Sequence, residues 1–500
     1  MLPVIQSLAE KGVQIRAIDQ NRAGKSMRPV GSGNGTPKVK AGQNRVLPRA
    51  VAQFQGSARL KAVLAWVAVV KRFVVCFDGT WQKLRQAKPT NIAIIARSIA
   101  HTHTLADGST IPQIVLYSQG VGANVDALGK DGFMDGLSEW LNRMLGGVFG
   151  EGLEDNIVET YLRLAFNYEE GDEIYVFGFS RGAFCARSFA GLVGCAGIVS
   201  RMHAEKAWDA FRLYRSNPGA KATKAQQEDF DRSRRDFRAS YGKGKRAADG
   251  TRIKSDDAPK ITYLGIFDTV GQRGVPSALG GLAAKLNKRF GFHDMRIGEG
   301  VLSARHAVAV DENRLGFPPT LWEGVDEANT RAHCQEGRQH YAQRWFIGTH
   351  GDVGGGEGSP LSAAPLKWIA EGAAECGLRF YGTYGENESP LAQAVREAGL
   401  VFKGKISRPR FWDSLSPMNY PFASRRIWAA KSRKEQPTMD FAANMLDPSV
   451  MERLSDSEMK PRYNPDPLKP FRPVLIPPAP KGKKAKAAKP AKPSGETRAE

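Results

Sequence analysis

Short apolar runs alternate with helix-like segments through the middle of the chain. Five of these runs predict buried β-strands: RFVVCF, IPQIVLYSQG, IYVFGFS, KITYLGIFDTV with the strand ending at Asp268, and QRWFIGTHGDVGGG with the strand ending at His350. A segment with apolar residues at Ile157, Tyr161 and Leu164 has helical periodicity and leads into the third run. Apolar strands separated by helices favour a mostly parallel sheet with helices on both faces, so the predicted fold class is α/β.

Composition divides the chain into four parts. Residues 1–70 show little periodicity and are rich in basic residues, Gly and Pro, and we expect them to be disordered or weakly ordered. A folded domain is predicted over 71–375, with a polar insertion at about 203–258 that is expected to be a surface insertion or a lid. An extension over 376–472 is expected to pack on this domain. The Lys/Pro/Ala-rich tail 473–500 is expected to be disordered.

The net charge of +21 is concentrated at the two ends of the chain. Residues 1–72 contribute +11 and residues 481–500 contribute +5, which leaves +5 for residues 73–480. A basic chain can bind nucleic acid or an anionic membrane. Because the middle of this chain is nearly balanced, no specific nucleic-acid partner is predicted, whereas contact of the basic ends with a membrane surface stays open.

Cysteine usage and hydropathy indicate synthesis in a reducing cytoplasm. The five cysteines are irregularly spaced and form no C-x-x-C pair, which argues against a disulfide framework or a zinc ribbon. The nearest approach to a membrane span, Ala62–Val70, is too short and lacks the pattern of a signal peptide. His350 and Asp352 alone are too few ligands for an ion, so no metal and no other cofactor is predicted.

A serine between two glycines follows the third predicted strand. In Gly178-Phe179-Ser180-Arg181-Gly182 the residues two before and two after the serine are glycine, and a small-residue, helix-like stretch follows. A sharp turn from a strand into a helix needs small residues at these places, and it exposes the serine oxygen to a substrate. We interpret the segment as a nucleophile elbow, with an idle serine in a glycine-rich turn as the alternative.

A serine nucleophile needs a base and an acid, which in this arrangement follow it in the order acid, then histidine. Asp268 and His350 occur in that order, each expected directly after a strand. Asp268 would orient the imidazole, and His350 would take the proton of Ser180 and return it to the leaving group. Asp352 is the rival acid, with a turn residue as its alternative role.

Seven other histidines lack a position at a strand end, and one of them, in the segment SARHAVAV, is expected in a packed helix. They are His101, His103, His203, His293, His306, His333 and His340.

The first predicted strand ends in CFDGT. This segment is similar to the D-x-D-G-T of phosphoaspartyl phosphatases, but Cys76 stands where their nucleophilic aspartate would be. A loop after an early strand commonly supplies a backbone N–H to an oxyanion. Gly79 is therefore the expected first oxyanion donor, and the N–H of Arg181, the residue after the serine, is the second.

Taken together, these motifs resemble the type VI secretion phospholipase effectors of the α/β-hydrolase class, within a wider uncharacterised bacterial and fungal hydrolase domain. The similar stretches are VVCFDGTWQ, YSQGVG, GDEIYVFGFSRGAFCARSFAGLVGCAGI, GIFDTVG, ARHAVAVDENRLGFPPTLW and QRWFIGTHGDVGGG, over roughly residues 73–375. The resemblance implies an α/β-hydrolase domain in which Ser180, Asp268 and His350 form the triad. It also implies hydrolysis of phospholipid esters without a cofactor, secretion through a type VI system, and a secretion-system or immunity partner.

Three functions stay open at this point. The first is a serine hydrolase of phospholipid acyl esters, and the second is an esterase for a small soluble ester. The third is an inactive hydrolase-fold protein that binds membrane or nucleic acid through its basic ends.

Overall fold

The computed structural model describes most of the middle of the chain. The described residues are 70–79, 86–120, 148–219, 222–246, 252–253, 257–270, 295–314, 317–332, 340–384, 387–397, 403–407, 425, 427, 437–456, 458 and 462–475. The predicted disorder of residues 1–69 and 476–500 therefore concerns segments outside the described residues. At the other end of the extension, a described helix reaches Leu475, so the tail begins later than the predicted residue 473.

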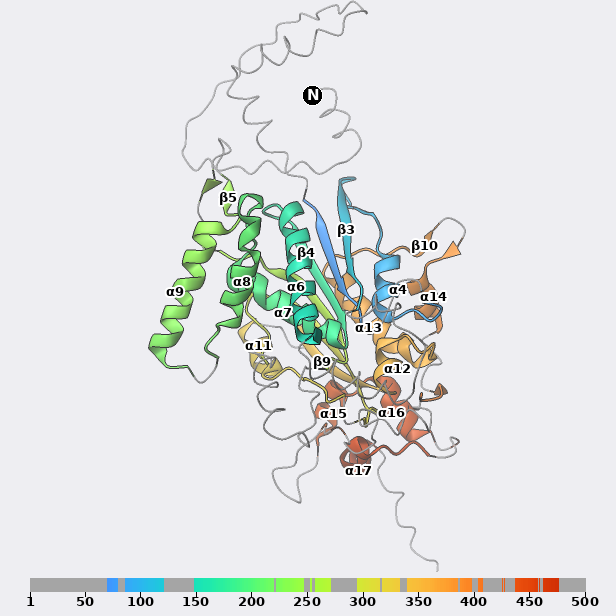
Figure 1. Cartoon of the computed structure of the whole chain (residues 1–500). Coiled ribbons are helices and arrows are strands. Elements are labelled where there is room, and N and C mark those ends of the chain that lie inside the picture. Colours follow the sequence, from blue (N-terminus) through green and yellow to red (C-terminus); the bar gives the residue numbers. More distant parts are fainter. Residues whose placement is uncertain are drawn as a thin grey trace, which may run out of the picture.

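A seven-stranded sheet forms the centre of the structure (Figure 1). Its order is β2-β3-β1-β4-β7-β8-β9, and all neighbours pair in parallel except β2 and β3. The strands are β1 Arg72–Phe77, β2 Thr102–Thr104, β3 Thr110–Ser118, β4 Glu173–Phe179, β7 Ile261–Phe267, β8 Ala304–Ala309 and β9 Tyr341–Phe346. Two small hairpins pair β5 Lys245–Arg246 with β6 Arg252–Ile253, and β10 Thr383–Tyr384 with β11 Asn387–Glu388. The predicted α/β fold class is confirmed.

Helices cover both faces of the sheet, and each face has its own apolar core (Figure 1). One face carries α6 Val148–Asn167, α7 Arg181–Ala196, η1 Arg201–Lys206, α8 Ala207–Arg215 and α9 Lys224–Tyr241. The other carries α4 Asn91–Ser98, α13 Ala363–Glu375 and α14 Pro390–Glu397. The inner strands β1, β4, β7 and β8 are buried on both sides, and their sequences are accordingly apolar at most positions.

The described part of the polar insertion is largely helical. Helices α8 and α9 pack against α7, and α8 also contacts α6. A capping box at Thr223 and Gln226 starts α9, whose side chains are mostly exposed. This part of the insertion therefore extends one helical layer of the fold.

Two local expectations differ from the structure. His306 lies in β8, so its predicted placement in a helix is wrong. The segment ARHAVA is buried at nearly every position because it is an inner strand, and a continuous short apolar run cannot separate strand from helix by its period. Strand β9 ends at Phe346 rather than at His350, which instead begins the short helix α12 His350–Gly354.

Beyond α14, the described part of the extension packs on the end of the sheet. It contains α15 Met439–Met445, α16 Pro448–Ser455, η7 Asp466–Phe471 and α17 Arg472–Leu475. Leu446, which is fully buried, forms a parallel bridge with Trp345 of β9. Together they belong to a third apolar cluster, which joins β8 and β9 to the extension.

The chain turns sharply from β4 into α7 at Ser180. Ser180 has φ 59° and ψ −123°, a backbone conformation that is costly for a residue with a side chain. A Cβ atom at Gly178 would lie 2.5 Å from the carbonyl oxygen of Gly182, and one at Gly182 would lie 2.3 Å from that of Phe77. The two glycines therefore allow the turn to sit directly against the end of β1.

The packing of Leu446 predicts that the extension is part of the cooperative fold. Leu446→Ala leaves a cavity at the edge of the sheet, and we expect it to lower the free energy of unfolding by about 2–5 kcal/mol. Met439→Ala in the same extension removes a side chain that is 54% exposed and should change it by less than about 0.5 kcal/mol. Urea denaturation of the full chain measures both, and equal effects would contradict this packing.

The tight turn predicts opposite outcomes for two glycines of α7. Gly182→Ala places a methyl group against rigid backbone atoms, and we expect a loss of at least about 1–3 kcal/mol. Gly194→Ala, on the same helix with no atom within 4 Å of its added Cβ, should gain up to about 1 kcal/mol from helix propensity. Thermal unfolding of both variants tests this, and a Gly182→Ala protein as stable as Gly194→Ala would refute it.

Candidate active site

Ser180, His350 and Asp268 form one hydrogen-bonded chain at the carboxyl ends of β4, β7 and β9. His350 Nε2 lies 2.7 Å from Ser180 Oγ, and His350 Nδ1 lies 2.5 Å from Asp268 Oδ2. Asp268 is fully buried, whereas Ser180 and His350 keep 7% and 6% of their surface exposed. Strand ends of a parallel sheet meet at one edge, so residues far apart in sequence converge there.

Besides His350, two further residues of the described part of the chain donate hydrogen bonds to Asp268. The N–H of Ala309 donates to Oδ1 at 2.9 Å, and Arg425 donates to both carboxylate oxygens at 2.5 and 2.9 Å. Burial alone would raise the pKa of Asp268. The charge of Arg425 and the hydrogen bonds from His350 and Arg425 outweigh that effect, so the pKa lies well below its usual range. The carboxylate is therefore ionised at neutral pH.

The backbone and the ring of His350 are both fixed. Its N–H donates to Glu312 Oε2 at 3.1 Å, and the rings of Phe179 and Phe317 lie 4.7 and 4.9 Å from the imidazole centre. This packing leaves the imidazole between its two hydrogen-bond partners, the serine and the aspartate.

Asp352, the other candidate for the acid, binds Thr349 and Ser407. Its Oδ2 accepts the N–H of Thr349 at 2.9 Å and the N–H of Ser407 at 3.0 Å, and its Oδ1 accepts the hydroxyl of Ser407 at 2.6 Å. Asp352 therefore caps α12, and Asp268 is the acid that faces His350.

The structure differs from the expectation for Gly79. Its N–H donates to Asp78 Oδ1 at 2.7 Å, so it is already engaged. The carboxylate of Asp78 is buried, and it also accepts hydrogen bonds from Thr90 and Tyr117. Arg181, the other expected donor, is the first residue of α7.

Several residues around the site were not predicted from the sequence. Glu312 contacts the site from the stretch ARHAVAVDENRLGFPPTLW, in which it had no predicted role, and Arg425 and Ser407 contact it from segments without a recognised motif. His306 accepts the N–H of Thr269, next to Asp268, at 3.2 Å, and burial lowers its pKa to about 3. The sequence would have indicated this position of His306 only if the run ARHAVA had been recognised as a strand, β8.

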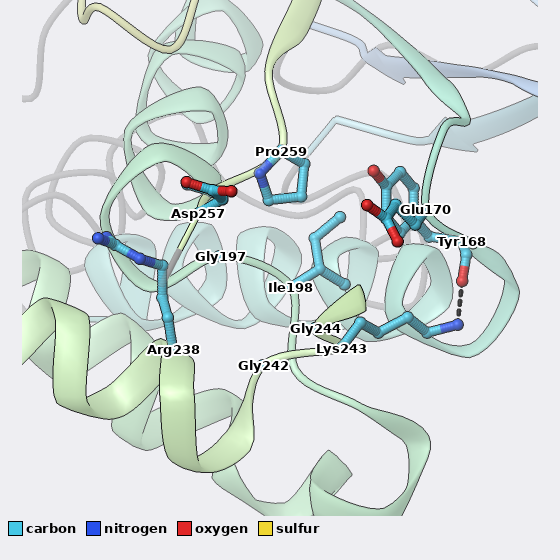
Figure 2. Close-up of a pocket in the computed structure, with 11 residues that line it drawn as sticks. Tyr168, Glu170, Gly197, Ile198, Arg238, Gly242, Lys243, Gly244, Asp257 and Pro259 are labelled. Atoms are coloured by element: carbon cyan, nitrogen blue, oxygen red, sulfur yellow. Dashed lines mark hydrogen bonds between the residues drawn. The ribbon is translucent and has the colours of Figure 1, made fainter. Parts of the chain in front are cut away.

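A pocket of about 130 Å³ lies elsewhere (Figure 2). Its lining includes Tyr168, Gly197 and Pro259, which precede β4, follow α7 and precede β7. These are the amino ends of the strands, so the pocket is separated from Ser180 by the length of the sheet. Lys243 in this pocket donates to the carbonyl of Tyr168 and pairs with Glu169, as Figure 2 shows for the first of these bonds.

Two features are absent from the part of the chain that the structure describes. None of its helices is both long and apolar enough to cross a membrane. No group of three or more His, Cys, Asp or Glu side chains in the described ranges is arranged to hold a metal ion.

Similar proteins include one from yeast and two of solved structure. The uncharacterized protein YEL023C of Saccharomyces cerevisiae is 29% identical over 257 residues, which are 49% of this chain and 32% of the yeast protein. An uncharacterized protein from Pseudomonas aeruginosa has 18% identity and a TM-score of 0.31, over 72% of this chain and 50% of that one. The Tle1 effector bound to the VgrG spike of the type 6 secretion system has 20% identity and a TM-score of 0.29, over 58% and 53%. The chain thus spans about a third of the yeast protein and about half of each solved chain.

A family profile matches most of the region in which the motifs lie. The family described as "T6SS, Phospholipase effector Tle1-like, catalytic domain" matches residues 71–372, which is more than half of the chain. This range contains Ser180, Asp268 and His350, and it confirms the resemblance drawn from the sequence motifs. The chain therefore belongs to the family of Tle1-like phospholipase effectors of type VI secretion systems.

Proposed function

We propose that this protein is a serine hydrolase that cleaves phospholipid acyl esters in the manner of a phospholipase A. The observation that carries the proposal is the hydrogen-bonded chain of Ser180, His350 and Asp268 at one edge of the sheet. A nucleophile beside a base that is itself oriented by an acid is the arrangement that acyl transfer requires.

The first half of the reaction forms an acyl-enzyme. His350 Nε2 takes the proton of Ser180 as Oγ attacks the ester carbonyl, whose π electrons move onto its oxygen. When the tetrahedral intermediate collapses, the ester C–O bond breaks and the leaving lysophospholipid takes the proton from His350. Asp268, which is ionised, accepts the hydrogen bond of Nδ1 throughout and stabilises the imidazolium.

The second half releases the fatty acid. Water attacks the acyl carbonyl and gives a proton to His350, which returns it to Ser180 Oγ as the acyl bond breaks. In both halves we assign stabilisation of the oxyanion to the backbone N–H of Arg181 at the start of α7. Gly79 joins it as a donor only if its N–H exchanges the bond to Asp78 for one to the oxyanion.

The tight turn at Ser180 supports a nucleophilic role for this residue. Ser180 stands with a strained backbone between a strand and the start of a helix, as the serine of a nucleophile elbow does. Strain that is held by close packing of Gly178 and Gly182 is typical of functional sites. A structural turn without chemistry would be satisfied by glycine at this position, with less strain.

The proposal of a lipid substrate and of secretion-system partners is based on the family to which the chain belongs. Its description names a phospholipase effector of type VI secretion, which supports a phospholipid substrate, delivery by such a system, and contact with a component of its machinery. The positive charge at both ends of the chain is compatible with contact at an anionic membrane surface.

Release of fatty acid from mixed phosphatidylethanolamine and phosphatidylglycerol vesicles tests the proposal. We expect release by the wild-type protein and a loss of at least about 1,000-fold in Ser180→Ala, because the nucleophile is removed. Ser233→Ala, which changes an exposed serine of α9, is the matched control and should retain wild-type activity.

The other outcomes separate the competing functions. If the wild-type protein hydrolyses only a short-chain activated ester, with the same dependence on Ser180, it is a small-molecule esterase and the phospholipid assignment fails. If it cleaves neither substrate and a fluorophosphonate probe does not label Ser180, the hydrolase proposal is rejected. Membrane or nucleic-acid binding that survives Ser180→Ala would then favour an inactive binding protein.

A further inference from the structure

Arg425 forms a two-pronged ion pair with the acid of the proposed triad. Its Nη1 donates to Asp268 Oδ1 at 2.5 Å and its Nη2 donates to Asp268 Oδ2 at 2.9 Å. The side chains of Arg425 and Asp268 are 2% and 0% exposed, so solvent screens this pair very little. A bidentate guanidinium fixes the plane of a carboxylate, which a single hydrogen bond leaves free to rotate.

The guanidinium is itself anchored to the framework of the site. Nη1 also donates to the carbonyl of Ala309, at the end of β8, at 2.9 Å, and Nη2 donates to that of Phe317 at 2.8 Å. The ring of Phe317 packs on His350. Arg425 thus connects the ends of β7 and β8 with the segment that packs on the imidazole.

The positive charge of Arg425 acts on the same carboxylate that faces the imidazole of His350. The negative charge of Asp268 stabilises a protonated imidazole, and a cation bound to the same carboxylate offsets part of this stabilisation. We propose that Arg425 is a positioning residue of the hydrolase, which orients the Asp268 carboxylate toward His350 and offsets part of its negative charge. This inference rests on the proposed function.

Arg425 comes from outside the region that the family profile matches. The profile ends at residue 372, and Arg425 belongs to the extension. Two residues later, Ile427 is buried in the cluster that joins the extension to β8 and β9. The extension makes further contacts near His350: Ser407 holds Asp352, as described above, and Tyr463 donates to Asp311 Oδ2 at 2.8 Å.

The Asp311 carboxylate that accepts the hydrogen bond of Tyr463 also contacts the segment just before His350. The same oxygen of Asp311 accepts the N–H of Gly348, two residues before His350, at 2.7 Å. The proposed catalytic apparatus is therefore completed by a segment that lies more than 50 residues beyond the family-matched range.

Other charged or titratable groups also face the Asp268–His350 pair. Glu312 and Arg314 follow β8, and His306 lies on β8, with Arg187 of α7 beside His306. All of them are retained when Arg425 alone is replaced, so the difference between variants isolates its effect.

The test compares Arg425→Gln, Arg425→Lys and wild type in the full chain. The readout is the pH dependence of kcat/KM for ester hydrolysis and of the rate of Ser180 labelling by a fluorophosphonate. For Arg425→Gln we expect kcat to fall about 100-fold with little change in KM, because the carboxylate loses its orientation. The acidic limb of both profiles should move to higher pH, because the protonated imidazole is no longer opposed by a cation. Arg425→Lys keeps the charge without the fork, so kcat should fall while the limb stays near its wild-type pH.

Arg453→Gln is the matched control. Arg453 is another buried arginine of the extension, and it donates to the carbonyl of Gly404 and lies over the ring of Tyr463. Its replacement should lower the melting temperature without moving the acidic limb. A purely structural role for Arg425 would give the same pattern, and finding it in Arg425→Gln would overturn the inference.

The remaining outcomes are also decisive. If Arg425→Gln does not fold, a folded Arg425→Lys with wild-type kcat overturns the inference, and one with reduced kcat and an unmoved limb supports it. If neither variant folds, Arg425 is required for folding and the positioning role is rejected. Labelling of wild-type Ser180 by the probe separates the two proposals: without it the hydrolase itself fails, and with it the variants bear on Arg425 alone.

Discussion

A buried negative charge at the end of β7 constrains the whole of this site. Asp268 has no exposed surface, and an unpaired ion in such a place would cost several kcal/mol. Its carboxylate is instead matched by a guanidinium, an imidazole and a backbone N–H. Removing one partner of a buried pair typically costs about 3–5 kcal/mol, so these segments have to stay together for the fold to tolerate the charge.

The geometry of the parallel sheet also keeps these segments together. The register that pairs Phe267 with Ala307 and Ala309 with Phe346 brings the ends of β7, β8 and β9 to one edge. The backbone N–H of Asp268 donates to Ala307 O at 2.7 Å, although Asp268 has a positive φ of 35°. The strand ladder therefore holds both strained residues of the site, Ser180 and Asp268, at the ends of neighbouring strands.

The sequence predicted what local patterns encode and missed what depends on distant contacts. Strand β1 was predicted to the residue and β4 to within one residue at each end, because each is a short, largely apolar run followed by a polar residue. The convergence of Ser180, Asp268 and His350 followed from strand ends in a parallel sheet. The β8 strand was missed because a short apolar run has no distinguishing period. Arg425 had no local signal, since it meets Asp268 across 157 residues, and the engagement of Gly79 depends on the rotamer of Asp78.

The bridge between Leu446 and Trp345 has a consequence for self-association. Strand β9 ends the order of the described sheet, and an uncovered last strand offers its backbone N–H and C=O groups to other chains. The bridge and the hydrogen bond from Asp447 N–H to the carbonyl of Trp345 occupy part of that row. Proteolytic loss of the extension around Leu446 would uncover an apolar strand edge. The remaining protein would then be prone to intermolecular strand pairing and aggregation.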